Sequence, residues 1–197
     1  MSETMYTISF LPGQWDGKLI PAWTWRYDPA TPVRQGEDHI YVSQNPDHPE
    51  GYDNASLLTP KRYGVGSKAT LRCAFEGIGC PEIILVPETE ENDRGEKKYG
   101  ACFEVVLWKN GINVWRHFRE SGKCFWHKRL GLTYPVTEGE IHTLTVEVLE
   151  KELSVTLDGQ NTTLRTEDLP EAFHFGITMC EGEARVYDFM VKGENLA

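Results

Sequence analysis

Residues 103–130, which read FEVVLWKNGINVWRHFRESGKCFWHKRL, decide the fold of this chain. Asn110-Gly111 is a strong signal for a two-residue hairpin turn, because both positions of that turn type need positive φ angles. Pairing Lys109 with Ile112 across the turn then sets the register of the hairpin. Because side chains alternate between faces along a strand, this register predicts that Glu104 lies directly opposite His117.

The predicted hairpin has one apolar face and one polar, aromatic face. The apolar face contains Phe103, Val105, Leu107, Ile112, Val114 and Phe118. The other face contains Glu104, Val106, Trp108, Asn113, Trp115, His117 and Arg119. A solvent-exposed sheet face rarely needs two Trp residues for stability alone, so this second face is the candidate site.

A second turn follows at Glu120-Ser121-Gly122. We predict a three-residue loop with Gly122 in the left-handed conformation, which brings His127 opposite Trp115 and Arg129 opposite Asn113. His127 and Arg129 then join the candidate site.

A two-residue Ser121-Gly122 loop is the alternative for this turn, and it would instead turn Trp126 and Lys128 to the polar face. We favour the longer loop because it keeps Cys124, Trp126 and Leu130 with the core. A slip of one residue reverses every facing, so the choice of loop decides which side chains reach the site.

Composition limits the classes of function. The 197 residues fit one domain, residues 1–197, and 40% of them are hydrophobic, which is enough for a sizeable core. A net charge of −10 argues against nucleic acids and anionic membranes as partners. No apolar run approaches the ~20 residues of a membrane span, and the N-terminal residues do not read as a secretory signal. We therefore expect a cytoplasmic protein.

The cysteines support a reducing compartment. There are five, Cys73, Cys80, Cys102, Cys124 and Cys180, without the spacing of a zinc motif. We expect five free thiols, most of them buried. No spacing of residues indicates a metal site, so we expect no metal among the site residues and no other cofactor. Asp188 in the Asp-Phe-x-Val strand is either a calcium ligand or a turn partner, and the turn role is favoured.

Most of the remaining chain alternates like strands, and we find no apolar period of 3.6 residues over ten or more positions. The expected strands are 39–43, 69–76, 82–86 (apolar, buried on both faces), 142–149, 153–157, 173–179 and 185–191. Residues 166–172 are expected to form one helical turn. Short strands with Gly-rich turns predict an all-β fold, a two-sheet antiparallel sandwich.

The C-terminal third resembles a known superfamily. Residues 142–160, HTLTVEVLEKELSVTLDGQ, and 173–193, FHFGITMCEGEARVYDFMVKG, are similar to the end of a concanavalin A-like lectin/glucanase domain. The shared features are the Asp158-Gly159 turn, the strand containing Gly176 and the terminal Asp-Phe-x-Val strand at 188–191. This resemblance implies a concanavalin A-like jelly roll and, commonly, carbohydrate bound on one sheet.

The resemblance leaves open whether the protein is an enzyme. Laminarinase-like hydrolases of this superfamily carry Glu-x-Asp-x-x-Glu on one strand, but Glu104 is followed by Val105, Val106 and Leu107. Hydrolysis needs two carboxyl groups, so a second acid would have to come from a loop. Polysaccharide lyases of this fold use His, Tyr and Arg, but their diagnostic strand motifs are absent. Simple binding needs only stacking indoles and hydrogen-bonding groups.

Each feature of the predicted face also has a structural interpretation. Glu104 and His117 can form an acid–base pair or an ordinary cross-strand ion pair worth ~0.2–1 kcal/mol. Trp108 and Trp115 can be stacking platforms, or they can be covered by residues 13–35, which hold Trp15, Trp23, Trp25 and Tyr27.

The sequence thus predicts a carbohydrate-binding or carbohydrate-processing protein. Glu104 and His117 are the candidate catalytic residues, and the candidate ligand-binding residues are Trp108, Asn113, Trp115, Arg119, His127 and Arg129. The alternative is a structural or protein-interaction domain without a small-molecule site, in which the same face meets another chain. The oligomeric state is left open.

Overall fold

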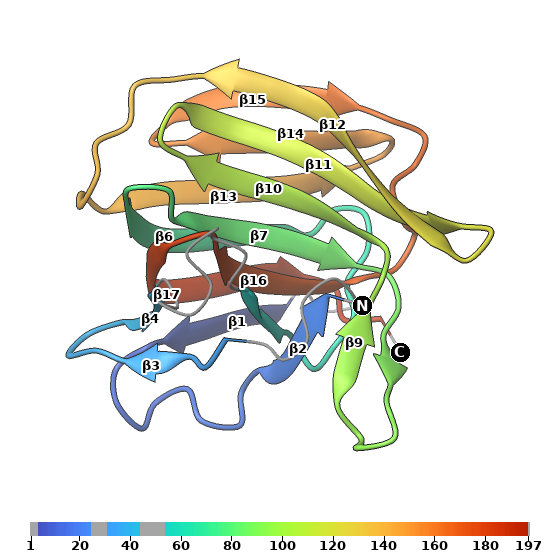
Figure 1. Ribbon diagram of the computed structural model, residues 1–197. Helices are drawn as coiled ribbons and strands as arrows, with labels where there is room; N and C mark the ends of the chain where they lie inside the picture. The colour runs from blue at the N-terminus through green and yellow to red at the C-terminus, as the bar shows by residue number, and fades with distance from the viewer. Residues whose placement is uncertain (1–3, 25–30, 44–53, 197) are drawn as a thin grey trace.

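The computed structural model describes residues 4–24, 31–43 and 54–196, and these residues form two β-sheets packed face to face (Figure 1). In the described part of the chain, no helix is long and apolar enough to cross a membrane. The expectation of an all-β two-sheet sandwich is confirmed. Residues 166–172 do not form the expected helical turn.

The first sheet, sheet A, contains eight strands from the described residues. Across the sheet, seven of them are ordered β15 (Gln160–Arg165), β14 (Glu152–Leu157), β13 (His142–Leu149), β6 (Lys68–Glu76), β17 (Glu183–Gly193), β4 (Ile40–Val42) and β3 (Arg34–Gln35). The eighth, β1 (Thr4–Ser9), pairs with β17. All of these pairs are antiparallel.

The second sheet, sheet B, carries the hairpin at 103–130. Its order is β12 (Lys123–Thr133), β11 (Gly111–Glu120), β10 (Cys102–Trp108), β7 (Cys80–Val86), β16 (His174–Cys180), β5 (Asn54–Leu58), β2 (Ile20–Thr24), β9 (Lys97–Tyr99) and β8 (Glu90–Glu91). Its pairs are antiparallel except β2 with β9, which are parallel.

The core lies between the sheets and follows the alternation of the sequence. In sheet A, the predicted alignment of Val148 with Leu153 and of Val146 with Val155 is confirmed, and all four side chains are fully buried. In sheet B, the apolar face of the hairpin meets them, except for Phe118, which was predicted on this face and instead stacks on Phe125 near the end of the hairpin. Each such side chain contributes ~1.5–3 kcal/mol by leaving water, so the alternation stabilises the sandwich. The other face of sheet B therefore points away from sheet A.

The first hairpin forms, but with a shifted register. Trp108 pairs with Gly111, so the turn residues are Lys109-Asn110 rather than Asn110-Gly111. Among Lys109, Asn110 and Gly111, only Gly111 has a positive φ, at 125°. A Cβ on Gly111 would lie 2.2 Å from the carbonyl oxygen of Leu132, so the close approach of β12 requires glycine here. The prediction that Glu104 lies directly opposite His117 is wrong, because Glu104 is opposite Trp115.

The second hairpin takes the alternative loop. Glu120 pairs with Lys123 across Ser121-Gly122, and both loop residues have positive φ. Trp126 is then opposite His117, and Lys128 is opposite Trp115. The preference for the three-residue loop was therefore wrong, since a two-residue loop with left-handed residues matches the twist of the strands better.

A β-bulge in β12 restores the expected facing further along. Val114 pairs with Leu130 while Trp115 pairs with Lys128, so Arg129 is an extra residue. Beyond the bulge, Leu130 and Leu132 pack against the core. The bulge thus lets β12 present Lys128 on the outer face and Leu130 on the inner face.

Candidate functional site

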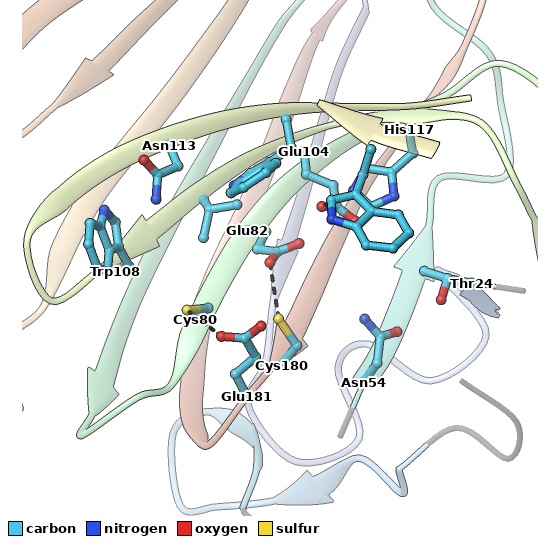
Figure 2. A pocket seen from close by; sticks show the side chains of 13 residues that line it. Thr24, Asn54, Cys80, Glu82, Glu104, Trp108, Asn113, His117, Cys180 and Glu181 are labelled. Carbon is cyan, nitrogen blue, oxygen red and sulfur yellow. Dashed lines mark hydrogen bonds and ion pairs between the residues drawn. The ribbon is translucent and has the colours of Figure 1, made fainter. Parts of the chain in front are cut away.

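The outer face of sheet B carries a cavity of about 370 Å³, which we call the outer pocket (Figure 2). It is lined by Thr24, Asn54, Cys80, Glu82, Glu104, Val106, Trp108, Asn113, Trp115, His117, Trp126, Cys180 and Glu181. These residues come from β2, β5, β7, β16, β10, β11 and β12, and from the turn after β16. Six central strands of sheet B thus contribute to one concavity, with β12 at its edge.

Glu104 and His117 form a polar contact in this pocket that is largely shielded from solvent. His117 pairs with Cys102 across the hairpin, so Glu104 is its diagonal neighbour. The Oε2 atom of Glu104 lies 2.7 Å from Nε2 of His117. The two side chains are only 12% and 9% exposed, which shields their interaction from solvent. The sequence therefore predicted the partners correctly but placed them in the wrong register.

A second carboxyl group, Glu82, reaches the pocket from β7. Glu82 pairs with Val106 of β10, which makes it a diagonal neighbour of Glu104. Burial raises the pKa of Glu82 well above its usual value, and the negative charge of Glu104 adds to the effect. The thiol of Cys180 donates a hydrogen bond to its Oε1 atom at 3.1 Å, whereas Oε2 is buried without a hydrogen-bond partner.

Glu82 was not among the predicted site residues, because residues 82–86 were interpreted as an apolar strand. The strand is indeed buried on both faces. The signal was present in the sequence, since Glu82 is the one acid in CPEIILV and a buried acid needs a partner or a function. The sequence led us to expect a second acid from a loop, and Glu181, in the turn after β16, is such an acid. The acid beside Glu104, however, comes from the neighbouring strand.

Three indole rings line the pocket. Trp108 and Trp115 pack against the small cluster of Cys80, Val106 and Cys180. Trp126 is more open, with 45% of its surface exposed. The ammonium group of Lys128 lies 5.6 Å from the centre of the Trp115 ring. Trp108 and Trp115 were predicted on this face, whereas Trp126 was expected in the core.

Residues 13–35 were considered as a possible cover over the indole rings of Trp108 and Trp115. Trp15 packs instead against the inter-sheet core, near Phe10. Thr24 lines the pocket. Trp25 and Tyr27 lie outside the described residues.

Asn113 adds a buried amide to the pocket wall, as the sequence predicted. It pairs with Val106 on the side of β10 that faces out. Figure 2 shows Asn113 beside Trp108, whereas Asn54 and Thr24 lie across the pocket on other strands. The pocket therefore offers hydrogen-bonding groups on more than one side.

Three predicted ligand-binding residues do not line the pocket. The guanidinium of Arg119 lies 3.0 Å from the carboxylate of Glu90, at the exposed end of the hairpin. His127 pairs with Arg116 and meets the edge of the Phe118 ring, because the two-residue loop turns it away. The guanidinium of the neighbouring Arg116 lies over the Phe118 ring, 4.9 Å from its centre.

Arg129, the extra residue of the bulge, is held by Asp168. Its guanidinium lies 2.8 Å from the Asp168 carboxylate, and that of Arg116 lies 3.2 Å away. Partial burial opposes ionisation of Asp168, but the hydrogen bond from Arg129 and the charges of both arginines lower its pKa. Because these arginines lie outside the pocket, the charged side chains that line it are mainly acidic.

The pocket also contains neighbouring thiols. Cys80 and Cys180 are opposite each other on β7 and β16. Two effects raise the pKa of the Cys180 thiol: the larger is its hydrogen bond with Cys80, and the second is its burial. Cys102 is buried next to Glu104, and burial together with that carboxylate raises its pKa. All five cysteines are free thiols in the structure.

No protein-family model matches this sequence, and no curated protein matches it. Solved structures match its fold. β-Agarase A in complex with oligoagarose has a TM-score of 0.66 at 9% identity, covering 100% of this chain and 95% of that one. The carbohydrate-binding module CBM66 from Bacillus subtilis has a TM-score of 0.57 at 10% identity, covering 80% and 88%.

The exoplasmic/lumenal domain of VIP36, in its Ca²⁺/Man3GlcNAc-bound form, has a TM-score of 0.56 at 11% identity, covering 84% of this chain and 82% of that one. This chain has the same β-sandwich fold. At such identities the likeness concerns the arrangement of the strands and not the residues of the pocket.

Proposed function

We propose that the outer pocket binds a carbohydrate. The observation that carries this proposal is the combination of three indole rings with a polar floor made of the buried side chains of Glu82 and Asn113 and the partly buried side chain of Glu104. Indole rings stack on the apolar faces of sugar rings, and carboxylates and amides bond to sugar hydroxyls. The cavity of about 370 Å³ lies within the usual range for small-molecule sites, ~300–1,000 Å³.

The ligand class follows from the charges of the lining residues. Three carboxyl groups line the pocket, from Glu82, Glu104 and Glu181, and His117 is the basic lining residue within the described chain. This balance favours an uncharged glycan over a uronate or a sulfated sugar.

The fold and its neighbours support the same proposal. We infer that the chain is a member of the concanavalin A-like superfamily, since its C-terminal motifs resemble that superfamily and its sandwich matches a structure solved with oligoagarose and one solved with Man3GlcNAc. We also propose a reducing, cytoplasmic location, which the five free thiols support.

The binding test compares two neighbouring aromatic residues on opposite faces of β12. Trp126 lines the pocket, whereas Phe125 stacks on Phe118 with ring centroids 5.4 Å apart. Titration calorimetry with neutral oligosaccharides, chosen from a glycan array, should show binding by the wild type. Trp126→Ala and Trp115→Ala should each weaken it by ~1–3 kcal/mol, and Phe125→Ala should not change it.

Two results would count against the binding proposal. One is the absence of binding to any glycan on the array. The other is an equal loss of affinity in Phe125→Ala, which would indicate a general effect on the hairpin. Self-association or capture of a protein partner through Trp126, without glycan binding, would favour the interaction-domain alternative.

Glycan hydrolysis is a second candidate function, favoured by the two carboxyl groups on adjacent strands. Glycosidases place an acid and a second carboxylate ~5–9.5 Å apart, and diagonal neighbours in a sheet are separated by a similar distance, ~7–8 Å between their backbones. In this case Glu104→Gln should abolish turnover while leaving binding nearly intact, a loss of ~10²–10⁴-fold.

Glu82→Gln should act in the same way, and Glu147→Gln, which changes an exposed carboxylate on sheet A, serves as the control. Turnover that survives Glu104→Gln unchanged would remove Glu104 from the mechanism. Binding without any turnover in the wild type would identify a pure binding protein.

A further inference from the structure

Two buried side chains, those of Cys102 and His117, and the partly buried side chain of Glu104 bring three different metal-binding atoms together. Their donor atoms all lie within 4.8 Å of one another. Cys102 and His117 are opposite each other on β10 and β11, and Glu104 follows Cys102 two residues later on the same face. Two neighbouring strands therefore hold the three donors on a rigid part of sheet B.

We propose that Cys102, Glu104 and His117 bind a zinc ion at the floor of the outer pocket. A thiolate, an imidazole and a carboxylate are zinc ligands, and three protein ligands leave a fourth position open. Calcium and magnesium prefer sites made of oxygen atoms alone, which this set does not provide. The fourth position would face the pocket, since Glu104 and His117 both line it.

The distances fit a tetrahedral site after small side-chain rotations. Zinc bonds of ~2.0–2.3 Å imply separations of about 3.3–3.8 Å between ligand atoms. The Sγ atom of Cys102 lies 3.9 Å from Oε1 of Glu104, and Nε2 of His117 lies 2.7 Å from Oε2. Zinc would take the place of the protons in these two contacts. The thiol proton of Cys102 leaves to solvent, and the proton on Nε2 of His117 leaves that atom, either to Nδ1 or to solvent, so that Nε2 can bind the metal.

Glu82 supplies an independent indication that this pocket receives a positive group. Its side chain is more than nine-tenths buried, lines the same pocket and leaves Oε2 without a hydrogen-bond partner. No lysine or arginine is among the described residues that line the pocket. A divalent cation would offset this concentration of buried acids and thiols.

The test uses metal ions alone, on the full chain after treatment with a chelator and a reductant. Co²⁺ reports the ligand type, because a thiolate ligand adds a near-ultraviolet charge-transfer band and a tetrahedral site gives strong visible bands. We expect both signals at one equivalent, and their loss when Zn²⁺ is added. Calorimetry with Zn²⁺ should give a stoichiometry of one and release of protons.

Matched variants locate the site. Cys102→Ser should remove the charge-transfer band, and both Cys102→Ser and His117→Asn should weaken zinc binding by more than about tenfold. Cys124→Ser and His127→Asn, which change the same residue types outside the pocket, should not affect it. Circular dichroism checks that each variant is folded.

Several outcomes would overturn the proposal. If the wild-type protein with Co²⁺ shows no thiolate-to-cobalt charge-transfer band, the proposal is wrong. This result does not depend on whether the variants fold. A band that persists in Cys102→Ser but disappears in Cys180→Ser would place the metal at the Cys80–Cys180 pair instead. Glycan binding is not needed for any of these readouts, so failure of the proposed function would leave this test unaffected.

Discussion

The carboxylate of Glu104 and the imidazole of His117 meet at 2.7 Å across a diagonal of the β10–β11 hairpin. Neither residue faces the other directly, because Glu104 is opposite Trp115 and His117 is opposite Cys102. Long side chains can bridge such a diagonal. The contact is nearly excluded from water, so breaking it should have a measurable effect on stability.

Removing the imidazole of His117 should lower the free energy of unfolding more than neutralising the carboxylate of Glu104. His117→Ala leaves the buried carboxylate without its partner, and we expect a loss of ~3–5 kcal/mol. Glu104→Gln keeps a hydrogen-bonding group of the same shape and should cost only ~1 kcal/mol. Urea unfolding with a chelator present measures both values.

The exposed pair of Lys68 and Glu147 is the control for this comparison, with side chains 44% and 39% exposed. Lys68→Ala should change the unfolding free energy by less than ~1 kcal/mol. If His117→Ala were as mild as Lys68→Ala, the buried contact would be energetically unimportant.

Two glycines in the hairpins should respond differently to alanine. At Gly111, a Cβ would lie 2.2 Å from the Leu132 carbonyl oxygen and 2.6 Å from the Tyr134 nitrogen. At Gly122, φ is 76° but no atom lies within 4 Å of the added Cβ. We expect Gly122→Ala to cost ~1–2 kcal/mol for its left-handed backbone and Gly111→Ala clearly more, about 3 kcal/mol or greater.

Thermal or urea unfolding of these two variants provides the comparison. Equal losses would mean that β10, β11 and β12 can separate locally at little cost, contrary to the close contact at Gly111.

Alkylation of the cysteines should show which thiols are buried and whether any is in a disulfide bond. Alkylation of the unfolded chain without reductant should modify all five cysteines, since none is in a disulfide. In the folded protein only Cys124 should react rapidly, because the other four are buried. Burial also raises the pKa values of Cys73 and Cys102, which lowers their thiolate fractions. Mass spectrometry after timed alkylation identifies the modified residues.

A disulfide in the freshly purified protein would contradict the expected reducing compartment. The structure places Cys73 in the inter-sheet core and Cys80 on the outer face, so any bridge to Cys80 would have to come from Cys180.

Acid should destabilise the protein partly through His174. Burial lowers the pKa of His174, and the charge of Arg62 adds to this effect. The unfolded chain therefore binds a proton at higher pH than the folded chain does. The stability that the neutral His174 provides is present above pH ~6.5, the unfolded pKa, and is lost as the pH falls through the folded value.

His174→Asn should make the unfolding free energy fall less between pH 7 and pH 5. The asparagine amide can still donate to the carbonyl oxygen of Thr59, which the His174 ring contacts at 2.8 Å. His127→Asn, an exposed position, should retain the pH dependence of the wild type. An unchanged pH dependence in His174→Asn would exclude this residue as a source of acid sensitivity.

The alternation of the sequence determined which face most pocket residues occupy. The first hairpin is shifted by two positions relative to the prediction, and an even shift leaves every facing unchanged. Glu104, Asn113, Trp115 and His117 therefore reach the pocket as expected. In the second hairpin the loop is one residue shorter, and this odd shift moves Trp126 in and His127 out.

Tertiary structure alone decided which distant strands meet. The pairing of β7 with β10 brings Glu82 beside Glu104, and the pairing of β7 with β16 brings Cys80 beside Cys180. Facing is a local property, because backbone geometry repeats every two residues. Strand neighbours instead depend on how the whole chain buries its apolar faces, and many pairings satisfy the same alternation. The polar face was therefore readable from the sequence, whereas its second acid and its pair of thiols were not.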